Sequence, residues 1–179
     1  MTLGEAKERV LQLLDEYGNG GDPELEERMI GLIDMAQKRL AGIQKTVKAV
    51  NLDCASREWL LPDDALGFYR LWVNGRLCRS LRWVGDKLLL PERAASAVVE
   101  YFALPESVDE ASDESMVLGI PETAAACLPF LVAGELLGTD MVQDGNGLLH
   151  IYSQMVAELD TTLPGTQGRV ANELYGGRR

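Results

Sequence analysis

The sequence is poor in the residues that most often carry catalysis and metal binding. Its 179 residues include one histidine, His150, and three cysteines, Cys54, Cys78 and Cys127. Ser-His-Asp, Cys-His and multi-histidine metal arrangements would all depend on His150, which we interpret as a surface or partly buried side chain without a catalytic role. The cysteines are odd in number and far apart, which favours a reducing cytoplasm over a disulfide framework.

Long hydrophobic runs and nucleotide motifs are absent as well. No window approaches the roughly 20 apolar residues of a membrane span, and the N-terminus lacks a basic start followed by an apolar stretch. We therefore expect a protein that begins at or near Met1 and stays in the compartment where it is made. No G-x-x-x-x-G-K-S/T loop occurs, and no G-x-G-x-x-G opens a helix. The sequence predicts no enzyme, no cofactor and no metal.

Positive charge is in short supply. There are 17 Lys and Arg against 28 Asp and Glu, a net charge of -11. Duplex binding relies on clustered cations that displace counterions, so this balance argues against a protein that grips DNA, although not against a wall that DNA slides past. The last sixteen residues, 164–179, carry +2, and the preceding 163 residues carry -13. An acidic body thus ends in a weakly basic tail.

Two helices are predicted at the N-terminus. Thr2 and Glu5 have the spacing of a capping box, and a three-and-four apolar repeat follows to Tyr17. A second helix is predicted from Asp22, as N-cap, to about Val47, with acidic residues in its first turn. So long a helix favours a bundle or a subunit interface.

The period changes from helical to two at Trp59. Asn74-Gly75 and Gly85-Asp86 have the composition of tight hairpin turns between alternating segments, so residues 59–104 are predicted to form a small antiparallel sheet. Residues 105–120 are expected to be an exposed, mobile acidic loop. Helices are predicted over 121–138, with a kink at Pro129, and over about 148–163. Residues 164–179 have no pattern that could bury itself and are expected to be flexible.

These elements predict an α+β fold, mainly α. Residues 1–58 would supply the two N-terminal helices and residues 121–163 the two C-terminal helices of a four-helix core. The small antiparallel sheet of 59–104 would be inserted between them, followed by the acidic loop of 105–120 and the tail of 164–179.

The sheet is the one region whose composition suggests nucleic acid. Residues 68–93 carry a net +4 with interleaved aromatic side chains. Arginines with stacking aromatics on a sheet are typical of single-strand binders. The alternative, which we favour, is that the aromatics form the sheet's own core and the arginines face water or an acidic neighbour. The residues concerned are Arg70, Trp72, Arg82 and Trp83.

The order of elements resembles a known family. The resemblance is carried by TLGEAKERVLQLLDEY, EERMIGLIDMAQKRLAGI, the segment from WLLPDD to VVEYFALPESV, IPETAAACLPFLVAGELL and a last helix containing Tyr152. In this order they resemble the head-tail connector adaptor proteins of long-tailed bacteriophages, over nearly the whole chain. The inserted sheet is larger than in smaller adaptors of that family.

The resemblance implies a virion protein of the neck, made and assembled in the host cytoplasm. It implies a homo-oligomeric ring, usually twelve-fold, between the portal protein and the stopper or tail-terminator protein, through which DNA passes without specific binding, and no membrane partner. It also implies portal contacts in the tail, at Leu174, Tyr175, Arg178 and Arg179. Arg70, Trp72, Arg82 and Trp83 are then candidates for subunit or ring-to-ring contacts. The alternatives are a nucleic-acid-binding module using residues 68–93 and a cytoplasmic helical scaffold protein.

Overall fold

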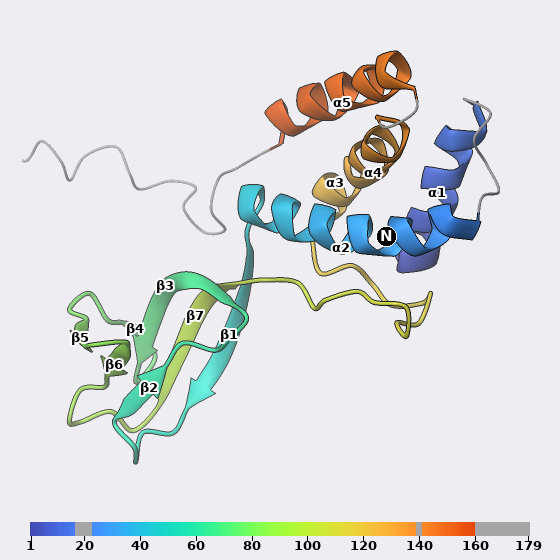
Figure 1. Ribbon diagram of the computed structural model, residues 1–179. Coiled ribbons are helices and arrows are strands. Elements are labelled where there is room, and N and C mark those ends of the chain that lie inside the picture. The colour runs from blue at the N-terminus through green and yellow to red at the C-terminus, as the bar shows by residue number, and fades with distance from the viewer. Residues whose placement is uncertain (17–22, 139–140, 160–179) are drawn as a thin grey trace, which may run out of the picture.

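The structure, a computed structural model, describes residues 1–16, 23–138 and 141–159. Helices gather on one side of the molecule and strands on the other (Figure 1). The elements are α1 (Leu3–Glu16), α2 (Pro23–Ile43), β1 (Thr46–Leu52), β2 (Glu58–Leu60), β3 (Ala65–Val73), β4 (Arg76–Leu77), β5 (Arg82–Val84), β6 (Lys87–Leu89), β7 (Ala97–Ala103), α3 (Glu122–Ala125), α4 (Leu128–Leu137) and α5 (Val142–Ala157).

The predicted capping box starts α1. The Thr2 amide donates to Glu5 Oε2 at 2.9 Å, and the Glu5 amide donates to Thr2 Oγ1 at 3.2 Å. These two bonds satisfy amides that the first helical turn leaves without partners. The apolar stripes of α1 and α2 then bury themselves against α4, in a core that includes Leu3, Val10, Leu14, Met29, Ile33, Leu40, Leu128 and Leu131.

Two glycines bring α4 and α5 into close contact. A Cβ on Gly145 would lie 2.9 Å from the Gly134 carbonyl oxygen. The predicted helix over 121–138 is divided into α3 and α4, with Pro129 in the first turn of α4. Proline has no amide hydrogen to donate, so it is accommodated where a helix begins.

The predicted fold class is wrong. Within the described residues the chain forms seven strands in two antiparallel sheets, ordered β1-β7-β3-β4 and β2-β6-β5, beside the helices. A mainly α four-helix core with a small inserted sheet does not describe this arrangement. The strands start at Thr46, within the segment assigned to helix and connector, and β1 pairs with β7 from Thr46↔Ala103 to Leu52↔Ala97. The second helix, predicted to extend to about Val47, ends at Ile43.

The strands have a hydrophobic core of their own. Leu71, Leu88, Val99 and Tyr101 are buried there, with Trp59 and Phe68 packed against them. The two predicted turns are confirmed: Asn74 and Gly75, both with positive φ, join β3 to β4, and Gly85, with φ of 64°, joins β5 to β6. The described part of the chain thus has two cores. We call residues 46–103 the β unit and the helices with residues 104–121 the helical unit.

Residues 105–120 lie along the helical unit and return to α1. The Leu3 amide donates to the Met116 carbonyl at 2.8 Å, and the Leu118 amide donates to the Met1 carbonyl at 3.1 Å. Val108, Leu118 and Ile120 are buried in the helical core, while Asp109, Glu110, Asp113 and Glu114 are exposed. The segment is therefore anchored by its apolar side chains and presents its carboxylates to solvent. Among the described helices, none is both long and apolar enough to cross a bilayer.

Candidate functional site

Two of the predicted contact residues lie on β3 and have partners within the β unit. The Trp72 indole Nε1 donates to Glu100 Oε1 at 2.9 Å. The Arg70 guanidinium lies 4.3 Å from the centroid of the Tyr69 ring, a cation–π contact. Trp72 is opposite Val98 and Arg70 is opposite Glu100 in the pairing of β3 with β7. Trp72 is thus engaged across the four-stranded sheet, and Arg70 packs against its neighbour on the same strand.

The other two predicted contact residues lie on β5, in the three-stranded sheet. β5 is an edge strand, since it pairs with β6 alone in the order β2-β6-β5, and all three of its residues are exposed. The Trp83 ring meets the Phe68 ring edge-on at 5.8 Å between centroids and keeps 38% of its surface exposed. The four predicted residues are therefore divided between two sheets, and Arg82 and Trp83 are the exposed pair.

Further arginines and apolar side chains surround Arg82 and Trp83. Arg76 and Arg79 are exposed, and within the described residues neither they nor Arg82 forms an ion pair. The segment 76–84 holds three arginines and no acidic residue. It also exposes large hydrophobic side chains at Leu77, Leu81, Trp83 and Val84. We call residues 76–84 the arginine edge.

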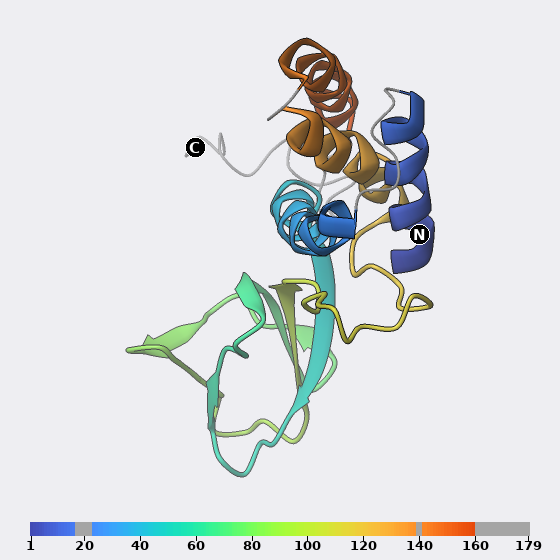
Figure 2. The same ribbon diagram turned by 45° about the vertical axis from the view of Figure 1, so that its right-hand side comes forward.

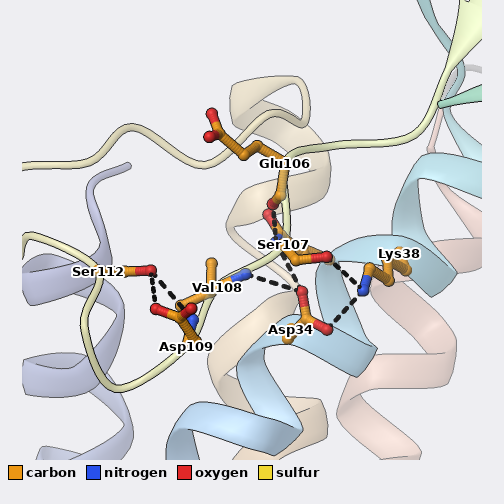
Figure 3. Close-up of polar contacts among 8 residues, drawn as sticks. Asp34, Lys38, Glu106, Ser107, Val108, Asp109 and Ser112 are labelled. Carbon is orange, nitrogen blue, oxygen red and sulfur yellow. Dashed lines mark hydrogen bonds and ion pairs between the residues drawn. The ribbon is translucent and has the colours of Figure 1, made fainter. Parts of the chain in front are cut away.

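A second polar site joins the acidic segment to α2. Asp34 Oδ1 accepts a hydrogen bond from the Val108 amide at 3.0 Å, and its Oδ2 contacts Lys38 Nζ at 2.6 Å. Lys38 Nζ also donates to Ser107 Oγ at 2.9 Å (Figure 3). Gln37, which is buried, donates through Nε2 to the Glu106 carbonyl at 2.7 Å. Three successive residues of the segment are thus held by one face of α2.

The electrostatics of this site favour the charged form of Asp34. Burial by itself would raise the pKa of Asp34, but hydrogen bonds from Lys38, the Val108 amide and Gln37 outweigh it, so the pKa is lowered from its ordinary value. Since the Asp34 carboxylate is ionised, its bonds to Lys38 and Val108 are of the stronger, charge-assisted kind. We interpret this site as the clamp of the acidic segment.

A third polar site fixes the end of the β unit next to the helices. Lys48 Nζ lies 2.7 Å from Asp64 Oδ2, and the Tyr101 hydroxyl donates to Asp64 Oδ1 at 3.2 Å. The hydrogen bond from Lys48 lowers the pKa of Asp64, and burial together with the bond to Asp64 raises the pKa of Tyr101. Because β1, β3 and β7 supply or flank these residues, the site holds the strands in register.

The histidine and the buried cysteine, for which no catalytic role was predicted, lie in unreactive surroundings. His150 is exposed on α5, with its Nε2 3.1 Å from Gln154 Nε2. Cys127 is buried, and burial raises the pKa of its thiol, which disfavours the reactive thiolate. No group of three or more His, Cys, Asp or Glu suited to a metal ion occurs in the described parts of the chain. The predicted portal contacts, Leu174, Tyr175, Arg178 and Arg179, lie outside the described residues.

The sequence interpretation missed the clamp. Asp34 and Lys38 have the spacing of a helical ion pair, which is a common surface feature and gives no hint of a third partner. Asp34 and Val108 are 74 residues apart, so their contact depends on the tertiary fold. Of the arginine edge, the sequence interpretation named Arg82 and Trp83, as part of the wider basic segment 68–93.

The chain was also compared with known proteins. Neither a scan against known protein families nor a search of curated proteins returned a match.

Proposed function

We propose that this chain is a structural, non-catalytic virion protein. It forms an adaptor ring that joins the portal protein to the stopper or tail-terminator protein of a long-tailed phage and prolongs the DNA channel. The ordered set of sequence segments that resembles the connector adaptors supports this proposal, because it extends over nearly the whole chain. The correction of the fold class changes the description of the core, but it does not change the order of these segments along the sequence.

The observation that carries the proposal is the distribution of charge. Residues 1–45 and 104–159, which supply the helices and the acidic segment, carry a net -13, whereas residues 46–103 carry +1. Residues 104–159 alone contain ten Asp and Glu and no Lys or Arg. A wall of this composition repels the phosphate backbone, so DNA moves past it without the counterion release that drives binding.

Exposed apolar side chains on both units give further support. Trp83 and Val84 are exposed on the β unit, and Met141, Val142 and Ile151 are exposed on or beside α5. Apolar patches on a protein surface are typical of protein–protein contact sites. A ring that sits between two other rings requires contact surfaces at more than one place.

The tail is assigned to the portal. Leu174 and Tyr175 supply apolar anchors and Arg178 and Arg179 supply charge, on a segment with few apolar residues of its own. Binding of purified portal rings should be measured with the full chain, with a chain that ends at Pro164, and with a chain in which residues 165–179 are scrambled. The scrambled chain is the matched control, because it keeps length and charge.

We expect portal binding by the full chain and its loss in both tail variants. Unchanged binding by the chain that ends at Pro164 would remove the tail from the mechanism. If the scrambled chain binds portal rings and the chain that ends at Pro164 does not, the composition of the tail matters and its residue order does not. No binding of portal rings by the full chain would contradict the proposed function itself.

A nucleic-acid-binding module is the second candidate function. The exposed arginines at 76, 79 and 82, together with the exposed Trp83 ring, favour it. The engagement of Trp72 with Glu100 counts against a stacking platform on the four-stranded sheet. Salt-sensitive binding of single-stranded DNA, lost when Arg82 and Trp83 are changed to Ala, is the result that would support this candidate.

A further inference from the structure

The arginine edge has charges and apolar surface that the described part of its own chain leaves unmatched. Arg76, Arg79 and Arg82 form no ion pair within the described residues, and β5 has one edge without a neighbouring strand. Trp and Arg are the residues most enriched in protein interfaces, where they supply much of the binding energy. Exposed edge strands are in addition surfaces on which proteins associate. The arginine edge therefore has the composition of a contact surface.

The acidic segment is the complementary surface. Asp109, Glu110, Asp113 and Glu114 are all exposed, and within the described residues their ion pairing is confined to Glu114 with Lys7, at 3.6 Å. Val117, close by in sequence, is 67% exposed, so this surface also has an apolar component. The clamp at Asp34 and the bonds to α1 hold the segment in place. Its carboxylates are thus presented from an anchored backbone.

The two surfaces lie on opposite sides of the molecule. The arginine edge projects at the far side of the β unit, and the tip of the acidic segment projects beside α1, in both views of the ribbon (Figures 1 and 2). One copy therefore cannot satisfy its own arginines with its own acidic segment. Complementary patches on opposite sides of one chain join head to tail, and such a contact closes into a ring when its rotation permits.

We propose that the arginine edge of one copy docks on the acidic segment, residues 109–117, of a second copy of this chain. The inference rests on the proposed function and deepens it by naming the two surfaces that join neighbours in the ring. A second copy is favoured over nucleic acid because the arginine edge carries only three cations, few for a site that binds phosphate, and because its exposed apolar side chains, Leu77, Leu81 and Val84, suit a protein surface. Each further copy of the chain, in contrast, brings one acidic segment for every arginine edge.

Two charge-reversal variants test the pairing. The first carries Arg79→Glu and Arg82→Glu, and the second carries Glu110→Lys and Glu114→Lys. All four side chains are exposed, so both variants should keep the native far-UV circular dichroism. Gln143→Glu with Gln154→Glu, two exposed positions on α5, adds negative charge outside both surfaces and serves as the control.

Self-association is measured by sedimentation over a range of protein and salt concentrations. We expect the wild type and the control to associate, with weakening by salt, and each reversal variant to lose at least roughly tenfold in affinity. An equimolar mixture of the two variants should recover association. In the mixture the reversed edge of the first variant meets the reversed segment of the second, and the two unchanged surfaces meet each other.

Three results would overturn the inference. The wild type shows no association at millimolar concentration and low salt, or the reversal variants associate as the wild type does, or both variants are weakened and their mixture is not rescued. Single-stranded DNA binding that is lost in the first variant while self-association is unchanged would assign the arginine edge to nucleic acid instead. Portal binding is measured separately, so a chain that self-associates without binding portal rings refutes the proposed function and leaves the inference standing.

Discussion

Removal of the Asp34 carboxylate is the sharpest test of how the acidic segment is held. In the folded chain this carboxylate accepts from the buried Val108 amide at 3.0 Å and pairs with Lys38 Nζ at 2.6 Å. Asp34→Asn keeps the shape and an oxygen acceptor but removes the charge. Asp34→Ala removes the acceptor as well and leaves the Val108 amide without its partner.

The expected cost follows from these contacts. A hydrogen bond to a charged group contributes about 1.5–3 kcal/mol, and a buried donor left unpaired costs about 1–3 kcal/mol. The Lys38 side chain is 37% exposed, so its ion pair is screened and adds about 0.5 kcal/mol. We expect Asp34→Ala to lower the free energy of unfolding by about 3 kcal/mol and Asp34→Asn by about 1.5 kcal/mol.

The effect should depend on pH in one direction. The pKa of Asp34 is lowered on folding, so the stability it contributes is complete above the pKa of the unfolded chain and is lost as pH falls through the folded pKa. The difference between the wild type and Asp34→Asn should therefore be largest near neutral pH. It should shrink as the pH falls through the lowered pKa of the folded chain, because the wild-type carboxyl then also becomes neutral.

Urea unfolding followed by far-UV circular dichroism measures these differences. The matched controls are Asp63→Asn and Asp63→Ala, since Asp63 is exposed and has no hydrogen bond or ion pair within the described residues. Both controls should change stability by less than about 0.5 kcal/mol. Equal stability of Asp34→Ala and Asp63→Ala, or an Asp34→Asn effect that grows as the pH falls, would refute the account of the clamp.

Two further predictions concern the packing of each unit. Gly145→Ala should destabilise by about 1–3 kcal/mol, because its Cβ would lie 2.9 Å from the Gly134 carbonyl oxygen, whereas Gly147→Ala on the same helix meets nothing within 4 Å and should stabilise by about 0.5–1 kcal/mol. Leu88→Ala in the buried core of the β unit should cost about 2–5 kcal/mol, against less than about 1 kcal/mol for the half-exposed Leu60→Ala. Thermal or urea unfolding measures all four, and equal effects within either pair would contradict the packing described.

Local features were predictable from the sequence. The capping box of Thr2 and Glu5 and the Asn74-Gly75 turn depend on residues a few positions apart, and both occur in the structure. Each is stabilised by contacts within the segment itself, so local composition is sufficient to indicate it.

The size of the β part was not predictable by the same means. β1 is stabilised by pairing with β7, which lies about 50 residues later, and its Val47 also fits the apolar repeat of the preceding helix. A short segment of mixed composition adopts the structure that its distant partner imposes. The mainly α prediction failed for this reason, since local periodicity contains no information on which strands pair.

Among the candidate contact residues, too, some features follow from the local sequence and others depend on the tertiary fold. Exposure of Arg82 and Trp83 follows from their place on an edge strand in a run without carboxylates. The bond from Trp72 to Glu100 depends on the register of β3 with β7, and the clamp on Asp34 joins residues 74 positions apart. Composition therefore indicated which residues carry charge and aromatic surface, and the tertiary fold decided which of them were available.

Imaging of assembled phage particles by electron cryomicroscopy tests the central claim most directly. The account predicts that this chain forms a ring directly below the portal, around the DNA channel, with the acidic segment of each copy against the arginine edge of its neighbour. Particles whose neck lacks this chain, or that contain it elsewhere and not as a ring, would contradict the account.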